Sequence, residues 1–196
     1  VSPKSPMSTE ASRAPPMSRF FVALRPDPDT AAELGELAAG LARRCRGKAL
    51  AACDLHLTLA FIGERPRPAA AGLLALLDGL PRELPALRLE TIGRFGPALL
   101  WIGPNGTPDW LAEVDQGLRQ RLDVAGETWD RRALRPHVTL VRNARDRAAA
   151  HAAIGAVPTI EVAGWRLLLG GTHEAATPAC RYRWWAPMAA ATGEPQ

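Results

Sequence analysis

The chain has 196 residues, of which 47% are hydrophobic and 22% are charged, a composition typical of a soluble globular protein. Its formal net charge of +4 is a weak basic bias, which argues against a protein that binds nucleic acid tightly by charge alone. No run of about 18 apolar residues occurs, so the sequence predicts no membrane-spanning helix.

The two ends of the chain do not carry the apolar patterning of the middle. Residues 1–16 contain four prolines and lack the apolar segment of a secretory signal, so we expect them to form a disordered extension. We expect a single folded domain over residues 17–190 and a flexible tail over residues 191–196.

Apolar periodicity and turn residues predict alternating strands and helices in the folded part. In chain order we expect a strand at 19–25, a helix between 27 and 47, a strand at 55–62, a helix at 68–80, a hairpin of strands at 86–95 and 98–102, a helix at 107–122, a strand at 135–142, a helix at 148–154, and closing strands at 159–169 and 181–185. This order indicates an α+β fold with a largely antiparallel sheet.

A short motif occurs twice. His-Leu-Thr-Leu at His56–Leu59 returns as His-Val-Thr-Leu at His137–Leu140, and the two copies hold two of the four histidines. Because side chains two apart in a strand share a face, each copy predicts a strand with an apolar back and a front of histidine and threonine. A two-lobed protein with approximate internal symmetry follows from this repeat.

Two histidines that face one cleft are suited to acid–base catalysis on a phosphodiester. Imidazoles titrate near neutral pH, so one can deprotonate the attacking oxygen while the other protonates the leaving oxygen. The hydroxyls of Thr58 and Thr139 can donate to the phosphate oxygens. The alternatives are a polar strand face without catalytic function, and a zinc site in which Asp54, Cys53 or His173 would complete the ligand set.

The three cysteines are Cys45, Cys53 and Cys180. They form no Cys-x-x-Cys pair, and their number is odd. We therefore expect no disulfide framework and a reducing compartment.

The two motifs resemble those of the 2H phosphoesterase superfamily, and the branch of RNA 2′,3′-cyclic phosphodiesterases in particular, which are also known as 2′-5′ RNA ligases. The first motif, Asp54–Gly63, is similar to that family's first motif over nearly its whole length. The second, Arg135–Arg142, includes the proline before the histidine and the arginine after it. The opening strand from Arg19 is also similar, and the match extends to about Met188.

The resemblance implies a bilobal α+β fold, in which two largely antiparallel sheets with flanking helices form a pseudo-two-fold arrangement around a central groove. It also implies metal-independent hydrolysis of RNA 2′,3′-cyclic phosphate ends to 2′-phosphomonoesters, with no cofactor. His56 would be the proton donor and His137 the proton acceptor, although the roles swap when the reaction runs backwards. Thr58, Thr139 and Arg142 would bind the phosphate.

Three positions raise questions about the site. Arg142 is five residues after His137, so strict alternation puts it on the opposite face unless the strand ends, twists or bulges. Phe20 or Phe21 could stack on the terminal base, but alternation lets only one of them face the groove. The family's serine-bearing strand is replaced here by Leu168–Thr172, which bears on substrate preference.

The reducing compartment that the cysteines indicate is the cytoplasm, and nothing in the sequence demands a protein partner, so we expect a monomer that does not bind a membrane. The resemblance implies that its partners are RNA ends with a 2′,3′-cyclic phosphate. A phosphodiesterase or weak reversible ligase acting on 2′-5′ linked oligonucleotides or small cyclic nucleotides is the enzymatic alternative. The non-enzymatic alternative is an RNA-end-binding module. A cationic and aromatic RNA surface could be formed by Arg181, Arg183, Trp184 and Trp185, but a closing strand with tryptophans in the core is the simpler interpretation. Two intact His-x-Thr motifs argue against that alternative.

Overall fold

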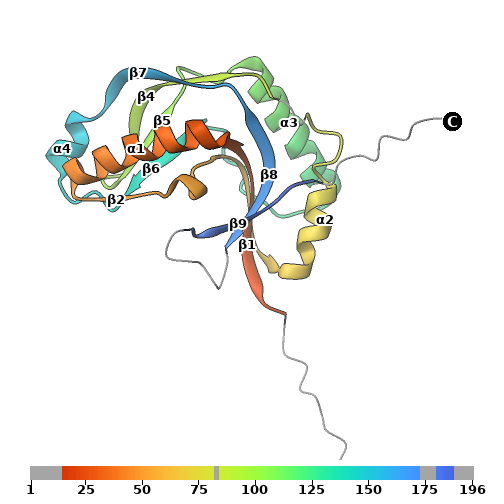
Figure 1. Ribbon diagram of the computed structural model, residues 1–196. Coiled ribbons are helices and arrows are strands. Elements are labelled where there is room, and N and C mark those ends of the chain that lie inside the picture. The colour runs from red at the N-terminus through yellow and green to blue at the C-terminus, as the bar shows by residue number, and fades with distance from the viewer. Residues whose placement is uncertain (1–14, 82–83, 173–179, 188–196) are drawn as a thin grey trace, which may run out of the picture.

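The computed structural model describes residues 15–81, 84–172 and 180–187 (Figure 1). The strands are β1 (Met17–Pro26), β2 (Lys48–Ala49), β3 (Leu57–Pro66), β4 (Leu87–Phe95), β5 (Leu99–Gly103), β6 (Val138–Arg142), β7 (Gly155–Val162), β8 (Trp165–Thr172) and β9 (Tyr182–Trp185). The helices are α1 (Pro28–Cys45), η1 (Ala52–Asp54), η2 (Arg67–Ala69), α2 (Ala70–Ala75), α3 (Asp109–Val124) and α4 (Arg147–Ala152). None of the helices in these ranges is long and apolar enough to cross a membrane.

The strands form one antiparallel sheet in the order β7-β4-β5-β6-β3-β1-β8-β9, with β2 paired to β6. This order divides into two halves of four strands that meet where β6 lies beside β3. A single recorded residue pair, Leu57 with Val138, joins the halves. The α+β class with antiparallel pairing is thus confirmed, and the two expected sheets are fused through this one pair.

The helices cross between the halves of the sheet. Helix α1 follows β1 in sequence but packs against β6, β7 and α4 of the other half, whereas α3 and α2 pack against β3 and β8. Figure 1 shows α1 and α4 together at one end of the molecule and α2 and α3 at the other. Leu34, Ala38 and Leu41 form the buried stripe of α1. Because each half is covered by a helix from the other, the two halves share one core.

Two expected elements differ in the structure. The helix expected at 68–80 is reduced to η2 and α2, and the chain then turns at Gly79, whose φ of 77° lies in the left-handed region that favours glycine. The strand expected at 159–169 is two strands, β7 and β8, with the reversal at 163–164. There Asp27 N–H donates to the Gly164 carbonyl at 3.1 Å, which ties the turn to the start of α1.

The expectation that no disulfide forms is wrong for one pair of cysteines. Cys53, in η1, and Cys180, just before β9, are disulfide-bonded with their Cα atoms 6.0 Å apart, while Cys45 is buried and unpaired. The partners are 127 residues apart in sequence. Spacing along the chain therefore could not reveal them, because the fold alone brings β9 against η1.

We expect the disulfide to stabilise the fold, because it closes a long loop in the unfolded chain. Its loss should reduce the free energy of unfolding by about 2–4 kcal/mol. Cys180→Ser should therefore lower the melting temperature of the oxidised protein, and a reductant should lower that of the wild type but not that of the variant. A thiol titration of the denatured, unreduced wild type should find only Cys45 reactive; three reactive thiols would contradict the bond.

Candidate functional site

The two histidines of the repeat are held by the same backbone contact. His56 Nδ1 lies 2.6 Å from the carbonyl oxygen of Asp54, and His137 Nδ1 lies 2.5 Å from that of Arg135. A carbonyl oxygen can only accept, so Nδ1 carries the hydrogen in both rings, and the lone pair of each neutral imidazole is on Nε2. Both rings thus have the tautomer that leaves Nε2 able to accept a proton.

The junction of the two halves brings the motifs together. Extending the Leu57–Val138 register by one residue in each direction puts His56 opposite Thr139, and Thr58 opposite His137. Directly opposed side chains in antiparallel strands have Cβ atoms about 5 Å apart. The cavity described below is lined by both Thr58 and His137, as this cross-pairing requires. Each predicted phosphate-binding hydroxyl therefore lies beside the histidine of the other motif.

A β-bulge turns Arg142 toward this site. In the β5–β6 ladder Ile102 pairs with Val138, but Leu100 pairs with Val141, so β6 carries one extra residue between them. The extra residue reverses the alternation and puts Arg142 on the same face as the histidine. The positive charge of Arg142 also contributes to lowering the pKa of His56, which it could not do from a distant position. The buried Nε atom of Arg142 has no hydrogen-bond partner among the described residues.

His56 lies in an aromatic enclosure. Its ring stacks on Phe21, with centroids 4.9 Å apart, and meets the edges of Tyr182 and Trp184 at 5.4 and 5.3 Å. Gly170 makes this stack possible, because a Cβ atom there would lie 2.5 Å from the Phe21 ring. The absence of a side chain at Gly170, in the segment Leu168–Thr172, is thus required by the packing around His56.

Burial controls the charge of His56. The residue is only 9% exposed, and its removal from water is the main cause that lowers its pKa from 6.5 to about 4. The positive charges of Arg142 and His137 lower it further, while the hydrogen bond to Asp54 opposes the shift. His56 is therefore neutral at pH 7 in the absence of an anion.

Strand β9 is fixed against the segment that carries His56. The buried Asp54 carboxylate accepts hydrogen bonds from the backbone N–H groups of Arg181 and Tyr182 at 2.9–3.2 Å, and Trp184 Nε1 donates to the carbonyl of Cys53 at 3.1 Å. Together with the disulfide, these contacts hold Tyr182 and Trp184 over the imidazole. The aromatic residues of β9 thus pack on the site and are only partly available as an RNA surface.

His137 lies in a more open setting. Its ring meets the edge of Phe95 at 4.8 Å and lies 6.0 Å from the centroid of Trp101. Trp101 packs over Gly93, where a Cβ atom would lie 2.1 Å from the indole. Burial lowers the pKa of His137 as well, opposed by the hydrogen bond to Arg135. Both lobes thus place an aromatic ring over a glycine of the neighbouring strand and beside the imidazole.

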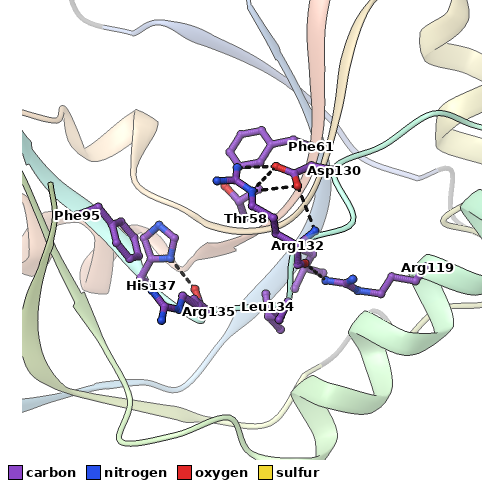
Figure 2. Close-up of a pocket in the computed structure, with 11 residues that line it drawn as sticks. Thr58, Phe61, Phe95, Arg119, Asp130, Arg132, Leu134, Arg135 and His137 are labelled. Atoms are coloured by element: carbon purple, nitrogen blue, oxygen red, sulfur yellow. Dashed lines mark hydrogen bonds and ion pairs between the residues drawn. The ribbon is translucent and has the colours of Figure 1, made fainter.

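A cavity of about 540 Å³ opens beside His137. Figure 2 shows His137 and Phe95 at one end of it, Arg119 at the other, and Phe61, Asp130 and Arg132 between them. Its volume is within the range of small-molecule sites. The wall formed by residues 130–135 is held in place by a hydrogen bond from Asp130 N–H to the Phe61 carbonyl at 2.9 Å. His56 does not line this cavity, so the two histidines differ in their access to it.

The two phenylalanines predicted as base-stacking candidates have different positions. Phe20 is in the core and contacts Trp185, whereas Phe21 faces the groove, as alternation requires. Phe21 is only 4% exposed, however, and its ring already stacks on His56. Two aromatic residues that the sequence analysis did not select, Phe61 and Phe95, line the cavity, and Phe61 is 50% exposed.

The structure also tests the alternative zinc site. In the described ranges, no group of three or more histidine, cysteine, aspartate or glutamate side chains could hold a metal. Two of the suggested ligands are otherwise engaged, Cys53 in the disulfide and Asp54 with the backbone of β9. His173 lies outside the described residues, and His151 is exposed on α4.

Known proteins resemble this chain in sequence and in fold. A family model described as the 2′-5′ RNA ligase superfamily matches residues 26–169. Two curated proteins are named RNA 2′,3′-cyclic phosphodiesterase. The protein from Escherichia coli K12 is 31% identical over 51% of this chain and 57% of its own length. The protein from Aeropyrum pernix is 30% identical over 45% of this chain and 53% of its own length. The crystal structure of E. coli LigT with 3′-AMP is 25% identical, with a TM-score of 0.65, and the match covers 89% of this chain and 97% of that one.

The lowered pKa of His56 predicts a pH-dependent stability. Between pH 6.5 and about 4 the unfolded chain binds a proton on His56 and the folded protein does not, so the free energy of unfolding should fall as the pH falls through this window. The contribution of this residue is about 3 kcal/mol. His56→Gln should lose less stability than the wild type between pH 7 and 4 in denaturant titrations, and His151→Gln should match the wild type. Equal losses in all three proteins would contradict the burial of a neutral imidazole.

Proposed function

Because the chain belongs to the 2′-5′ RNA ligase superfamily, we propose that it hydrolyses RNA 2′,3′-cyclic phosphate ends to 2′-phosphomonoesters. The observation that carries this proposal is the pair of imidazoles, each anchored through Nδ1 and brought together by the Leu57–Val138 pair. The names of the two curated relatives support the same reaction class. The matches cover only 57% and 53% of those relatives, so the activity of this chain rests on its own site.

In the proposed reaction, His137 is the general base. Its lowered pKa keeps it neutral, and Nε2 can take a proton from the water that attacks phosphorus. The bond from phosphorus to the 3′ oxygen then breaks, and His56 donates a proton to that oxygen. The phosphate remains on the 2′ oxygen.

His56 needs a proton before it can act as the general acid. The pKa of about 4 applies to the protein without an anion. A bound cyclic phosphate places a negative charge beside the ring, which favours the protonated form and raises the pKa. We therefore propose that His56 acquires its proton together with the substrate. The aromatic enclosure, which excludes water, strengthens this coupling because it lowers the local dielectric.

Three further side chains would bind the phosphate. The hydroxyls of Thr58 and Thr139 lie across the junction from the opposite histidine and can donate to the non-bridging oxygens. Arg142 adds a charge-assisted contact, for which its unpartnered buried Nε is suited. These donors would stabilise the charge that develops on the phosphorane. The reaction uses neither a metal nor a nucleotide cofactor, because the imidazoles perform both proton transfers.

The terminal base would stack on Phe61 or Phe95 instead of Phe20 or Phe21. Phe20 is in the core and Phe21 is covered by His56, whereas the other two rings line the cavity next to His137. Aromatic rings bind splayed RNA bases in this way. We further propose that the protein acts as a monomer in the cytoplasm. In that compartment the Cys53–Cys180 disulfide would be exposed to reduction.

The proposal predicts that both histidines are required. His56→Ala and His137→Ala should each reduce hydrolysis of an oligoribonucleotide ending in a 2′,3′-cyclic phosphate by at least a hundredfold. His151→Ala, which removes an exposed histidine on α4, is the matched control and should retain activity. EDTA should have little effect.

The product should carry only a 2′-phosphate, which resistance to a 3′-specific phosphatase would show. Near-wild-type turnover in either histidine variant, or a 3′-phosphate product, would refute the proposal. Tight RNA binding without turnover would instead favour an RNA-end-binding module.

A further inference from the structure

One cation at the edge of the site has no role in the proposed chemistry. Arg135 precedes His137 by two residues, just before β6, and lies beside the imidazole (Figure 2). It lines the cavity and is exposed to solvent. Its guanidinium makes no hydrogen bond or ion pair with any described residue.

The other arginines that line the cavity already have acidic partners. Arg119 Nε donates to Asp115 at 2.6 Å, and Arg132 Nε donates to Asp130 at 2.8 Å. Arg119 also helps to hold the cavity wall in place, because its guanidinium donates a hydrogen bond to the backbone carbonyl of Arg132 at 2.9 Å. Among the residues that line the cavity, Arg135 therefore carries the one positive charge that is not neutralised by a neighbouring carboxylate.

The two lobes differ in the residue that stands two positions before the histidine and in its exposure to solvent. In the first motif this residue is Asp54, which is 2% exposed and bonded to β9. Tyr182 and Trp184 cover His56 on that side. In the second motif the residue is the exposed Arg135, beside an open cavity. Among the described residues, the open space beside the paired motifs lies over the lobe that carries His137, so a polynucleotide attached to a phosphate in the site would extend there.

We propose that Arg135 binds the phosphodiester on the 5′ side of the terminal nucleotide, so that the site selects oligonucleotide ends over nucleoside 2′,3′-cyclic phosphates. This inference rests on the proposed function. A guanidinium matches two phosphate oxygens with two parallel N–H donors, and an exposed arginine keeps this geometry available. Arg135 is then a specificity residue that contacts the substrate one phosphate away from the reacting bond.

The test compares two substrates with the same terminal nucleoside. One is a dinucleotide ending in a 2′,3′-cyclic phosphate, and the other is the nucleoside 2′,3′-cyclic phosphate, which lacks the upstream phosphate. The wild type should prefer the dinucleotide, and Arg135→Gln should reduce the ratio of the two kcat/KM values by about ten- to a hundredfold, the range for a hydrogen bond to a charged group. The loss should fall mainly on KM, because the contact is the same in the ground and transition states.

Two further variants make the result specific. Arg135→Lys keeps the charge and should retain part of the preference, and Arg147→Gln removes an equal charge from an exposed site outside the cavity and should retain all of it. Added salt should weaken the preference of the wild type but not that of Arg135→Gln. An unchanged ratio in Arg135→Gln, or an equal loss in Arg147→Gln, would overturn the inference.

Failure of the proposed function gives a different result. In that case the wild type would hydrolyse neither substrate. Binding of the 2′-phosphorylated dinucleotide and nucleoside, measured by calorimetry, then tests Arg135 by itself. A tighter dinucleotide complex that weakens in Arg135→Gln would support the inference, and equal affinities in the wild type would overturn it.

Discussion

The pairing of Leu57 with Val138 is the contact on which the rest of the site depends. Within the described ranges it is the one strand pair between the halves of the sheet, and it is flanked on the groove face by His56, Thr139, Thr58 and His137. The apolar side chains of the pair are fully buried, and a slip of either strand by one residue would turn that strand's leucine or valine from the core to the groove. The same core packing that fixes the sheet therefore fixes the distance between the two imidazoles.

The near-symmetry of the two motifs hides a difference between the lobes. The first lobe encloses its histidine with Phe21, Tyr182 and Trp184 and holds that enclosure with a disulfide. The second leaves its histidine at the mouth of a cavity. Burial lowers the pKa of the enclosed His56 to about 4, whereas His137 borders the open cavity. One strand motif, used twice, thus provides two different environments, as the acid and base roles that we propose for His56 and His137 require.

The sequence was sufficient to predict the α+β class and both strands of the repeat, because alternation and a repeated motif are local signals. The structure brings the segments of His56 and His137 to the same junction of the sheet, and their joint action on one phosphate stays a prediction. The sequence did not decide which face of the strand Arg142 occupies, because the bulge that turns this residue toward the site depends on the pairing of β6 with β5. The Cys53–Cys180 bond and the enclosure of His56 by β9 needed contacts between distant segments. The position of Arg135 two residues before His137 was visible in the sequence. Nothing else in the sequence distinguishes this exposed arginine from the others.

The central claim is that the two histidines share one phosphate. An NMR titration of both imidazoles, with and without a nucleoside 2′-phosphate, tests it most directly. We expect both rings to carry the hydrogen on Nδ1, His56 to titrate near pH 4 without ligand, and the ligand to raise the pKa of both residues. A ligand that binds and shifts the pKa of only one histidine, or of neither, would contradict a phosphate site between them.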